Sequence, residues 1–227
     1  MEKKEFVEQY IFNDNTVQIE EDLPENKSSC MRFVSVYETD SDMLEAISKI
    51  FLNGEPFDLD PTFSKGVFYK NFPEPRLKSD LISQRDDVRQ SDCRNLEWIS
   101  DESINSIMFD PPFLFRDRKS VNNDKMCSRF SYFQTFNELI LMYTDSLKEF
   151  YRILKPKKFL VVKCQDMTDG SKPFYDTHCD TIKIARDIGF SLYDIGILVK
   201  KNKIIRKSKK QNCLRKVHSY YLIFRKG

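Results

Sequence analysis

The most informative part of this sequence is the stretch Ser103-Ile104-Asn105-Ser106-Ile107-Met108-Phe109-Asp110-Pro111-Pro112-Phe113. Residues 103–109 are rich in apolar and β-compatible side chains and predict a strand. The strand has to stop at the two prolines, because neither can donate a hydrogen bond to a sheet and each fixes its own φ at about −65°. The stretch therefore predicts a rigid elbow, residues 110–113, at the carboxyl end of a strand.

The elbow presents the carboxylate of Asp110, the carbonyl of Pro111 and the ring of Phe113 together. Open α/β sheets bind ligands at the carboxyl ends of their strands. The two oxygens can accept both N–H hydrogens of an exocyclic amino group, and the ring can stack on a planar base. Taken alone, these four residues are also compatible with a proline-rich turn after a buried strand.

The rest of the chain predicts alternating helices and strands. Bulky residues recur at steps of three and four between residues 132 and 154, which is typical of an amphipathic helix that ends at Lys155-Pro156. Helices are expected at residues 42–54, 132–154 and 177–188, and strands at residues 56–63, 80–83, 87–90, 103–109, 159–163, 191–200 and 219–224. This order predicts a mostly parallel sheet with helices on both faces and a closing antiparallel hairpin.

The size and composition of the chain narrow the class of protein. Its 227 residues fit one domain, residues 33–227, preceded by an acidic N-terminal arm, residues 1–32. No apolar run approaches the roughly 20 residues that span a bilayer, and the charged N-terminus does not predict a signal peptide. The six cysteines form no Cys-x-x-Cys pair, so neither a metal site nor a disulfide framework is expected. A cytoplasmic location is the expectation.

The elbow resembles the Asp/Asn-Pro-Pro-Tyr/Phe motif of S-adenosylmethionine-dependent amino-methyltransferases, which make N6-methyladenine or N4-methylcytosine in nucleic acids. Residues 150–163 resemble the helix-to-strand passage of that family, and residues 218–226 resemble the closing strand of its DNA enzymes. The resemblance covers residues 40–226. It implies a Rossmann-like class I methyltransferase fold, a mostly parallel seven-stranded sheet with a C-terminal antiparallel hairpin and helices on both faces.

The resemblance also implies a site for S-adenosylmethionine at the end of the first family strand. The family signature there, Asp-Pro-Phe-x-Gly-x-Gly, corresponds to residues 58–66, Asp-Leu-Asp-Pro-Thr-Phe-Ser-Lys-Gly, which keep Asp-Pro and an aromatic residue but only one glycine. Ser64 can hydrogen-bond the cofactor carboxylate and Lys65 can pair with it. The candidate cofactor-binding residues of this stretch are Asp58, Asp60, Pro61, Thr62, Ser64, Lys65 and Gly66. A simple turn is the alternative.

Two further cofactor contacts follow from the resemblance. Asp92 corresponds to the family aspartate that hydrogen-bonds the adenine amino group of the cofactor, and the adjacent Cys93 is a candidate for the same site or for core packing. The ribose hydroxyls need another acid near the second family strand, and the sequence leaves the choice among Asp80, Asp86 and Asp87 open.

The resemblance assigns methyl transfer to the elbow, with Asp110, Pro111, Pro112 and Phe113 as the catalytic candidates. Methylation of cytosine carbon-5 is excluded, because it needs a cysteine nucleophile in a Pro-Cys pair and no cysteine here follows a proline. A target base in a duplex has to flip out to reach such a site. Basic residues on two stretches are expected to contact phosphates: Arg116, Arg118, Lys119, Lys207, Lys209 and Lys210.

The acceptor is expected to be adenine N6 in DNA, because an aspartate at the first motif position is commoner for adenine in the resembling families. Cytosine N4 and RNA adenine are the alternatives, as are a small-molecule or protein amine and a catalytically silent subunit that keeps only the fold. Residues 200–216 hold 9 Lys/Arg and no acid, which favours a nucleic-acid partner over a solvated loop. No inserted target-recognition domain is evident, so recognition is expected from loops or a partner subunit.

Overall fold

The computed structural model describes residues 33–113, 133, 135–168, 174–199, 214 and 216–227. By its contacts the chain divides into two units, residues 1–32 and residues 33–227. The arm predicted at residues 1–32 lies outside the described residues, and everything below concerns the second unit.

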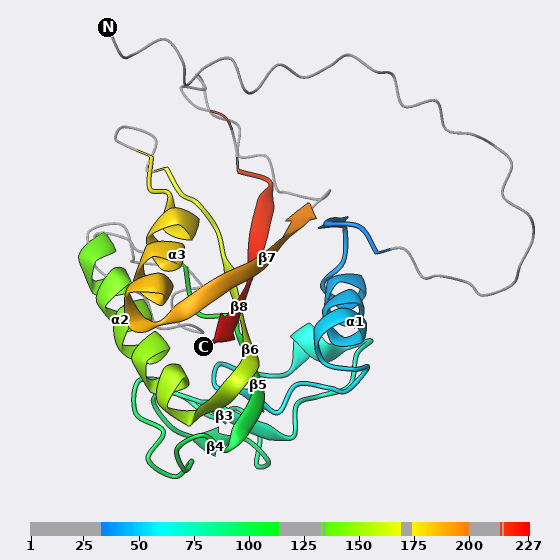
Figure 1. The fold of residues 1–227 in the computed structure, drawn as a ribbon, viewed down its shortest axis with the longest axis vertical. Helices are drawn as coiled ribbons and strands as arrows, with labels where there is room; N and C mark the ends of the chain where they lie inside the picture. Colours follow the sequence, from blue (N-terminus) through cyan, green and yellow to red (C-terminus); the bar gives the residue numbers. More distant parts are fainter. Residues whose placement is uncertain (1–32, 114–132, 134, 169–173, 200–213, 215) are drawn as a thin grey trace, which may run out of the picture. The chain divides into compact units, whose positions relative to one another are not determined.

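The described residues form one sheet of eight strands, with the order β1-β7-β8-β6-β5-β2-β3-β4 (Figure 1). The strands are β1 (Val36–Tyr37), β2 (Leu59–Asp60), β3 (Leu77–Asp80), β4 (Arg89–Gln90), β5 (Ile104–Phe109), β6 (Leu154–Cys164), β7 (Phe190–Val199) and β8 (His218–Lys226). All neighbouring strands are parallel except β8, which is antiparallel to both β6 and β7. The predicted α/β class and antiparallel closing strand are confirmed, and the strand beyond the expected seven is β1, which pairs with the edge of β7.

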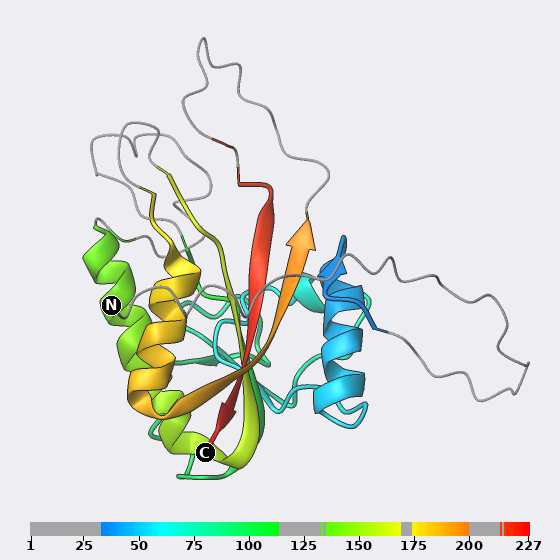
Figure 2. The ribbon, with the colours of Figure 1, turned by 45° about the horizontal axis from the view of Figure 1, so that its top comes forward.

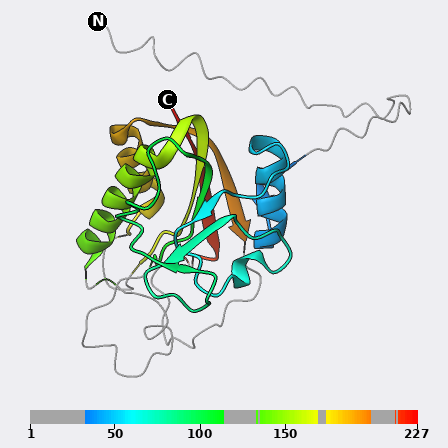
Figure 3. The same ribbon diagram turned by 90° about the horizontal axis from the view of Figure 1, so that it is seen from below.

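Three α-helices among the described residues cover the sheet: α1 (Asp40–Phe51), α2 (Phe136–Ile153) and α3 (Thr177–Ile188). The hydroxyls of Thr39 and Thr135 accept hydrogen bonds from the first turns of α1 and α2, which fixes where these helices begin. Gly189, with φ 121°, ends α3 as predicted. Helix α1 lies on one face of the sheet, and α2 and α3 lie together on the other (Figures 2 and 3).

The strand expected at residues 80–83 lies instead at Leu77–Asp80, and the one expected at 87–90 is reduced to Arg89–Gln90. Two other predicted strands differ from the structure for local reasons. The strand expected at residues 56–63 is reduced to Leu59–Asp60, because the Asp60 carboxylate accepts the backbone N–H of Thr62 and turns the chain. The strand expected at 159–163 begins already at Leu154, and its pairing shifts register before Phe159. Lys157, with φ 63°, lies in this irregular stretch.

Strand alternation sorts the buried side chains into two core layers. Phe109 and Val162 belong to the layer under α2 and α3, whereas Met108 and Val161 belong to the layer under α1. Asp110 and Lys163 continue the alternation of Met108 and Val161, and they lie at the carboxyl end of the sheet on the α1 side. Within the described part of the chain, no helix is both long enough and apolar enough to cross a bilayer.

Candidate active site

The elbow begins where β5 ends. The backbone N–H of Asp110 donates to Thr62 Oγ1 at 3.1 Å, and the Asp110 side chain is 26% exposed. Pro111 is buried, while Pro112 and Phe113 are half-buried. The carboxylate and the ring therefore both reach the surface from a fixed backbone.

The loop after β2, residues 61–66, surrounds a buried acid. Asp60 is 2% exposed, and its carboxylate accepts from Thr62 N at 2.8 Å, from Thr62 Oγ1 at 3.1 Å and from the Tyr69 hydroxyl at 2.8 Å. Burial raises the pKa of Asp60 to about 7, although these hydrogen bonds oppose the rise. Asp60 thus holds the loop in shape from inside, and the half-buried Thr62 and Ser64 and the exposed Lys65 are the loop residues that a ligand can reach.

Thr62 joins the two predicted motifs. Its hydroxyl donates to Asp60 and accepts from the Asp110 backbone, so one side chain ties the loop to the elbow across 48 residues of sequence. The structure therefore brings Asp60, Thr62 and Asp110 together.

The loop keeps the backbone shape of a glycine-rich turn with a single glycine. Ser64 has φ 52° and Gly66 has φ 73°, and both values lie in the left-handed region that favours glycine. A Cβ atom on Gly66 would lie 2.6 Å from the Phe63 ring, so only glycine fits there without movement. Ser64, in the region where the family signature has another glycine, therefore adopts a conformation that favours glycine.

Of the three acids that the sequence offers as ribose ligands, only Asp80 hydrogen-bonds to the loop after β2 among the described contacts. It ends β3 beside the loop, where its carboxylate accepts from Ser64 N at 2.8 Å and from Ile82 N at 3.0 Å. Asp87 instead pairs with Lys78 and Arg85, and Asp86 is exposed.

Two of the predicted cofactor residues have other partners. Asp58 precedes β2, and its carboxylate accepts from Asn105 N at 2.7 Å and Nδ2 at 2.8 Å near the start of β5, whereas Asp110 follows the end of that strand. The Cys93 thiol lies 3.2 Å from Ser146 Oγ on α2, and burial raises its pKa to about 11. Cys93 thus packs against α2, which favours the packing alternative, and Asp58 connects β2 to β5.

Asp92 lies just beyond the carboxyl end of β4. Its carboxylate pairs with Arg94 at 2.5 Å, and hydrogen bonds from Arg94 lower the pKa of Asp92 although partial burial opposes them. The side chain remains 31% exposed, and it lines a cavity together with Arg94 and with Asp145 and Lys148 of α2.

A buried lysine for which the sequence predicts no role in the site stands beside the elbow. Lys163 Nζ lies 2.7 Å from Asp40 Oδ1 and 3.5 Å from Asp110 Oδ2, and its side chain is 5% exposed. Burial lowers its pKa, but the charges of Asp110 and Asp40 outweigh burial and hold the pKa of Lys163 above its usual value. The signal in the sequence is a lysine inside the apolar run at 161–164, because a buried ammonium needs an anionic partner.

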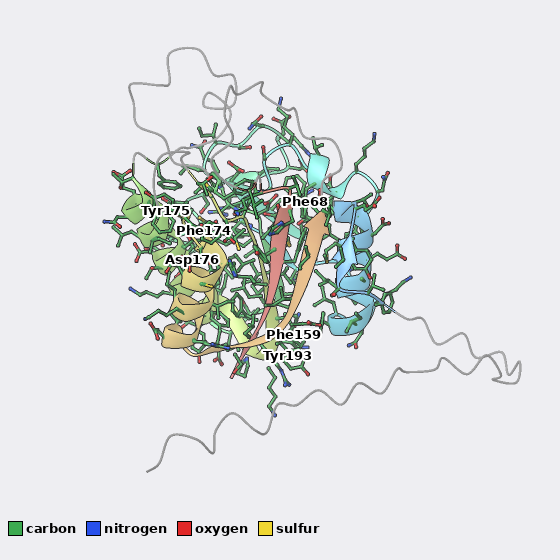
Figure 4. All side chains as sticks on the ribbon, turned by 90° about the horizontal axis from the view of Figure 1, so that it is seen from above. Phe68, Phe159, Phe174, Tyr175, Asp176 and Tyr193 are labelled. Atoms are coloured by element: carbon green, nitrogen blue, oxygen red, sulfur yellow. The ribbon has the colours of Figure 1, made fainter. Side chains whose placement is uncertain are left out.

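Aromatic rings complete the surroundings of Lys163. Its Nζ lies 4.6 Å from the centre of the Phe68 ring and 5.5 Å from that of Tyr221. Figure 4 shows Phe68 at the end of the sheet where β8 begins, and Phe159 and Tyr193 together at the opposite end. The Tyr221 hydroxyl donates to Asp40 Oδ1 at 2.5 Å, so α1, β6 and β8 meet at this point.

All six predicted phosphate-contacting residues lie outside the described residues: Arg116, Arg118, Lys119, Lys207, Lys209 and Lys210. The described residues that flank them lie at the same end of the sheet. Phe113 follows the carboxyl end of β5, and Val199, the last residue of β7, pairs with His218 at the start of β8. Among the described side chains, no group of three His, Cys, Asp or Glu residues could hold a metal ion.

Comparison with known proteins gives one family match. A family model for N6/N4 methylases, described as DNA methylase, matches residues 104–227, from the first residue of β5 to the last residue of the chain. No curated protein sequence matches the chain.

Similar solved structures include three that share little sequence with the chain. The cytosine-N4-specific PvuII DNA methyltransferase is 19% identical with a TM-score of 0.46, and the match covers 60% of this chain and 48% of that one. A DNA modification methylase from Thermus thermophilus, complexed with S-adenosyl-L-methionine, is 18% identical, with a TM-score of 0.44 and coverage of 60% and 53%. TrmN from Thermus thermophilus is 14% identical, with a TM-score of 0.46 and coverage of 82% and 48%. The match spans about half the length of each of these proteins.

Proposed function

This chain belongs to the N6/N4 DNA methylase family, and on that premise we propose that it transfers a methyl group from S-adenosylmethionine to the exocyclic amino group of a base in DNA. The observation that carries the proposal is the position of Asp110. Its partly exposed carboxylate ends β5 on a proline-stiffened backbone, which Thr62 ties to the loop after β2.

The residues around this loop fit S-adenosylmethionine. Gly66 leaves no room for a side chain, and the left-handed backbone at Ser64 gives the close turn that the family forms with glycine. Asp80 offers a carboxylate for the ribose hydroxyls, Lys65 a cation for the cofactor carboxylate, and Asp92 an acceptor for the adenine amino group. When bound, the cofactor supplies an electrophilic methyl group on a sulfonium, whose carbon–sulfur bond breaks with both electrons left on sulfur.

The elbow prepares the accepting nitrogen. The lone pair of an exocyclic amine is delocalised into the ring of the base, so the amine is a poor nucleophile. Asp110 and the Pro111 carbonyl accept its two N–H hydrogens, which favours a tetrahedral nitrogen whose lone pair forms the new bond to carbon. The nitrogen then loses one proton, and the Asp110 carboxylate is the acceptor already bonded to it.

The proposed substrate is a flipped-out base stacked on Phe113. Adenine N6 is the proposed acceptor because residue 110 is aspartate, and cytosine N4 is the second candidate within the same family. The basic residues around 116–119 and 207–210 are proposed to bind phosphates on the strength of residue type and of their place in the chain beside the elbow and between β7 and β8. Target recognition is proposed to come from these stretches or from a partner subunit.

A single assay tests the proposal. The chain is incubated with S-adenosylmethionine carrying a labelled methyl group and with unmethylated duplex DNA, and the digested nucleosides are identified by mass spectrometry. Label in N6-methyldeoxyadenosine supports the proposal in full, and label in N4-methyldeoxycytidine corrects the acceptor. Parallel reactions with single-stranded DNA and RNA test the choice of polynucleotide. No labelled nucleoside, together with no heat of cofactor binding in a calorimeter, would instead indicate a silent subunit.

A further inference from the structure

The buried lysine beside the elbow has no role among the predicted site residues, and its position requires an explanation. Transferring an ammonium group from water into a protein interior costs several kcal/mol unless anions compensate. Lys163 meets two carboxylates there, and they come from different elements, since Asp40 opens α1 and Asp110 follows β5.

The two contacts of Lys163 are unequal. Asp40 is the close partner at 2.7 Å, and the hydroxyl of Tyr221 holds the same Asp40 oxygen at 2.5 Å. The contact with Asp110 Oδ2 is longer, at 3.5 Å. Lys163 is thus anchored to α1 and β8 and presents a fixed positive charge to one oxygen of the elbow carboxylate.

We propose that Lys163 is a positioning residue for methyl transfer, anchored by Asp40 and Tyr221, which holds Oδ2 of Asp110 so that the other oxygen is directed at the substrate amine. This inference rests on the function proposed above. A carboxylate that turns freely about its Cα–Cβ and Cβ–Cγ bonds meets the amine in the right orientation only part of the time, and orientation supplies much of the rate of a displacement reaction. The salt bridge removes that freedom.

The test compares two buried lysines at opposite ends of the sheet. Lys226 is 7% exposed, and its Nζ binds Glu102 Oε1 at 3.0 Å and the carbonyl oxygens of Tyr151 and Leu154 at 2.8 Å. Lys163→Met removes a buried ammonium from two carboxylates, and Lys226→Met removes one from Glu102 and two carbonyl oxygens, so both variants should lose stability. Only Lys163→Met should also slow the chemical step.

The measurements are the single-turnover rate of methyl transfer to DNA at saturating S-adenosylmethionine and the calorimetric affinity for that cofactor. We expect Lys163→Met to lower the rate about 100-fold and to leave cofactor affinity within about threefold, since the lost contact acts on Asp110. Lys163→Arg, which restores the charge with a different shape, should recover about tenfold of the loss. Lys226→Met should keep the wild-type rate within about threefold.

Three outcomes would overturn the inference, and they can be told apart. A Lys163→Met rate equal to that of Lys226→Met would reduce Lys163 to a stabilising residue. A loss of cofactor affinity in proportion to the rate would make it a cofactor ligand instead. Wild-type protein that binds cofactor but methylates no base would remove the proposed function itself. Should Lys163→Met not fold, Asp40→Asn weakens the anchor while keeping its shape, and a rate unchanged in that variant would equally reject the role.

Discussion

The elbow after β5 and the loop after β2 meet at Thr62, but they hold their shapes by different means. The elbow is stiffened by covalent structure, since two successive prolines restrict its backbone. The loop is shaped by hydrogen bonds to two carboxylates, Asp60 at the end of β2 and Asp80 at the end of β3, and it includes a serine in a left-handed conformation. A covalent restraint is visible in the sequence, whereas a hydrogen-bonded one depends on groups from separate strands. The comparison predicts that substitutions in the elbow mainly lower the rate of methyl transfer, whereas substitutions in and around the loop mainly change the stability of the fold.

The largest expected effect is on the elbow. Asp110→Ala should lower the methyl-transfer rate by about 1,000-fold, equivalent to roughly 4 kcal/mol of barrier, because the acceptor of the amine hydrogen is lost. Cofactor affinity should stay within a few-fold, because the loop contacts remain. Asp110→Asn is the matched control, since it keeps the shape of the side chain and one acceptor oxygen. Its methyl-transfer rate should lie between those of the wild type and Asp110→Ala. An unchanged single-turnover rate in Asp110→Ala would refute the role of this carboxylate.

The loop should respond instead through the buried acid. The pKa of Asp60 is about 7 in the folded chain, against an ordinary value of 3.8. Between these values the unfolded chain has released the proton and the folded chain retains it, so this site lowers stability as pH rises, and the loss is complete above about pH 7. Asp60→Asn cannot ionise, and its side chain can still bond Thr62 and Tyr69. The stability of this variant relative to wild type should therefore rise by about 1.4 kcal/mol per pH unit between about pH 4 and 7.

Urea titrations of both proteins across this pH range measure that difference. A constant difference would mean that Asp60 is ionised in the folded protein throughout, and that the buried carboxylate is stabilised by more than Thr62 and Tyr69.

Close packing of the loop should have a smaller effect on stability. A comparison of alanine substitutions at two glycines distinguishes the cost of crowding from the cost of backbone strain. Gly54 and Gly66 have similar φ values, 83° and 73°, but a Cβ atom meets nothing within 4 Å at Gly54 and meets the Phe63 ring at 2.6 Å at Gly66. Gly54→Ala should cost about 1 kcal/mol through the left-handed conformation alone. Gly66→Ala should cost about 2–4 kcal/mol in total, because crowding against Phe63 adds to that strain. Equal losses in denaturant titrations would show that Phe63 moves aside freely.

The elements that the sequence predicts well are those with a strong local signal. The helix at 177–188 has the predicted bounds, with Gly189 as its end. The strand before the elbow starts one residue later than predicted and ends at Phe109, as predicted. The edge strand β1 is missed because two residues carry no periodicity. The early start of β6 is missed because Pro156 and Lys157 argue against a strand, and the structure accommodates them by a shift of register.

The predicted site residues also differ in how well local sequence places them. Thr62 belongs to the 58–66 stretch and Asp110 to the elbow, and the two residues are in contact. Asp58 belongs to the same stretch as Thr62, yet it precedes β2, and its carboxylate accepts from Asn105 near the end of β5 opposite the elbow. The contact between Lys163 and Asp40 spans 123 residues, so no local pattern could reveal it. These contacts depend on how distant strands and helices pack together, and the local sequence does not contain that information.

The smallest expected effect concerns the serine that stands in for the missing glycine. Ser64→Gly relieves the left-handed strain at φ 52° but gives the unfolded chain more freedom, and each contribution is about 1 kcal/mol or less, so stability should change by no more than about 0.5 kcal/mol. Ser64→Val, which is β-branched, should cost about 1–2 kcal/mol because its side chain is least compatible with this conformation. The ranking is measured by thermal and urea unfolding of both variants. If valine were tolerated as well as glycine, the loop would not be held in a glycine-like turn at residue 64, and its likeness to the family signature would be limited to Asp60, Pro61, the aromatic residue and Gly66.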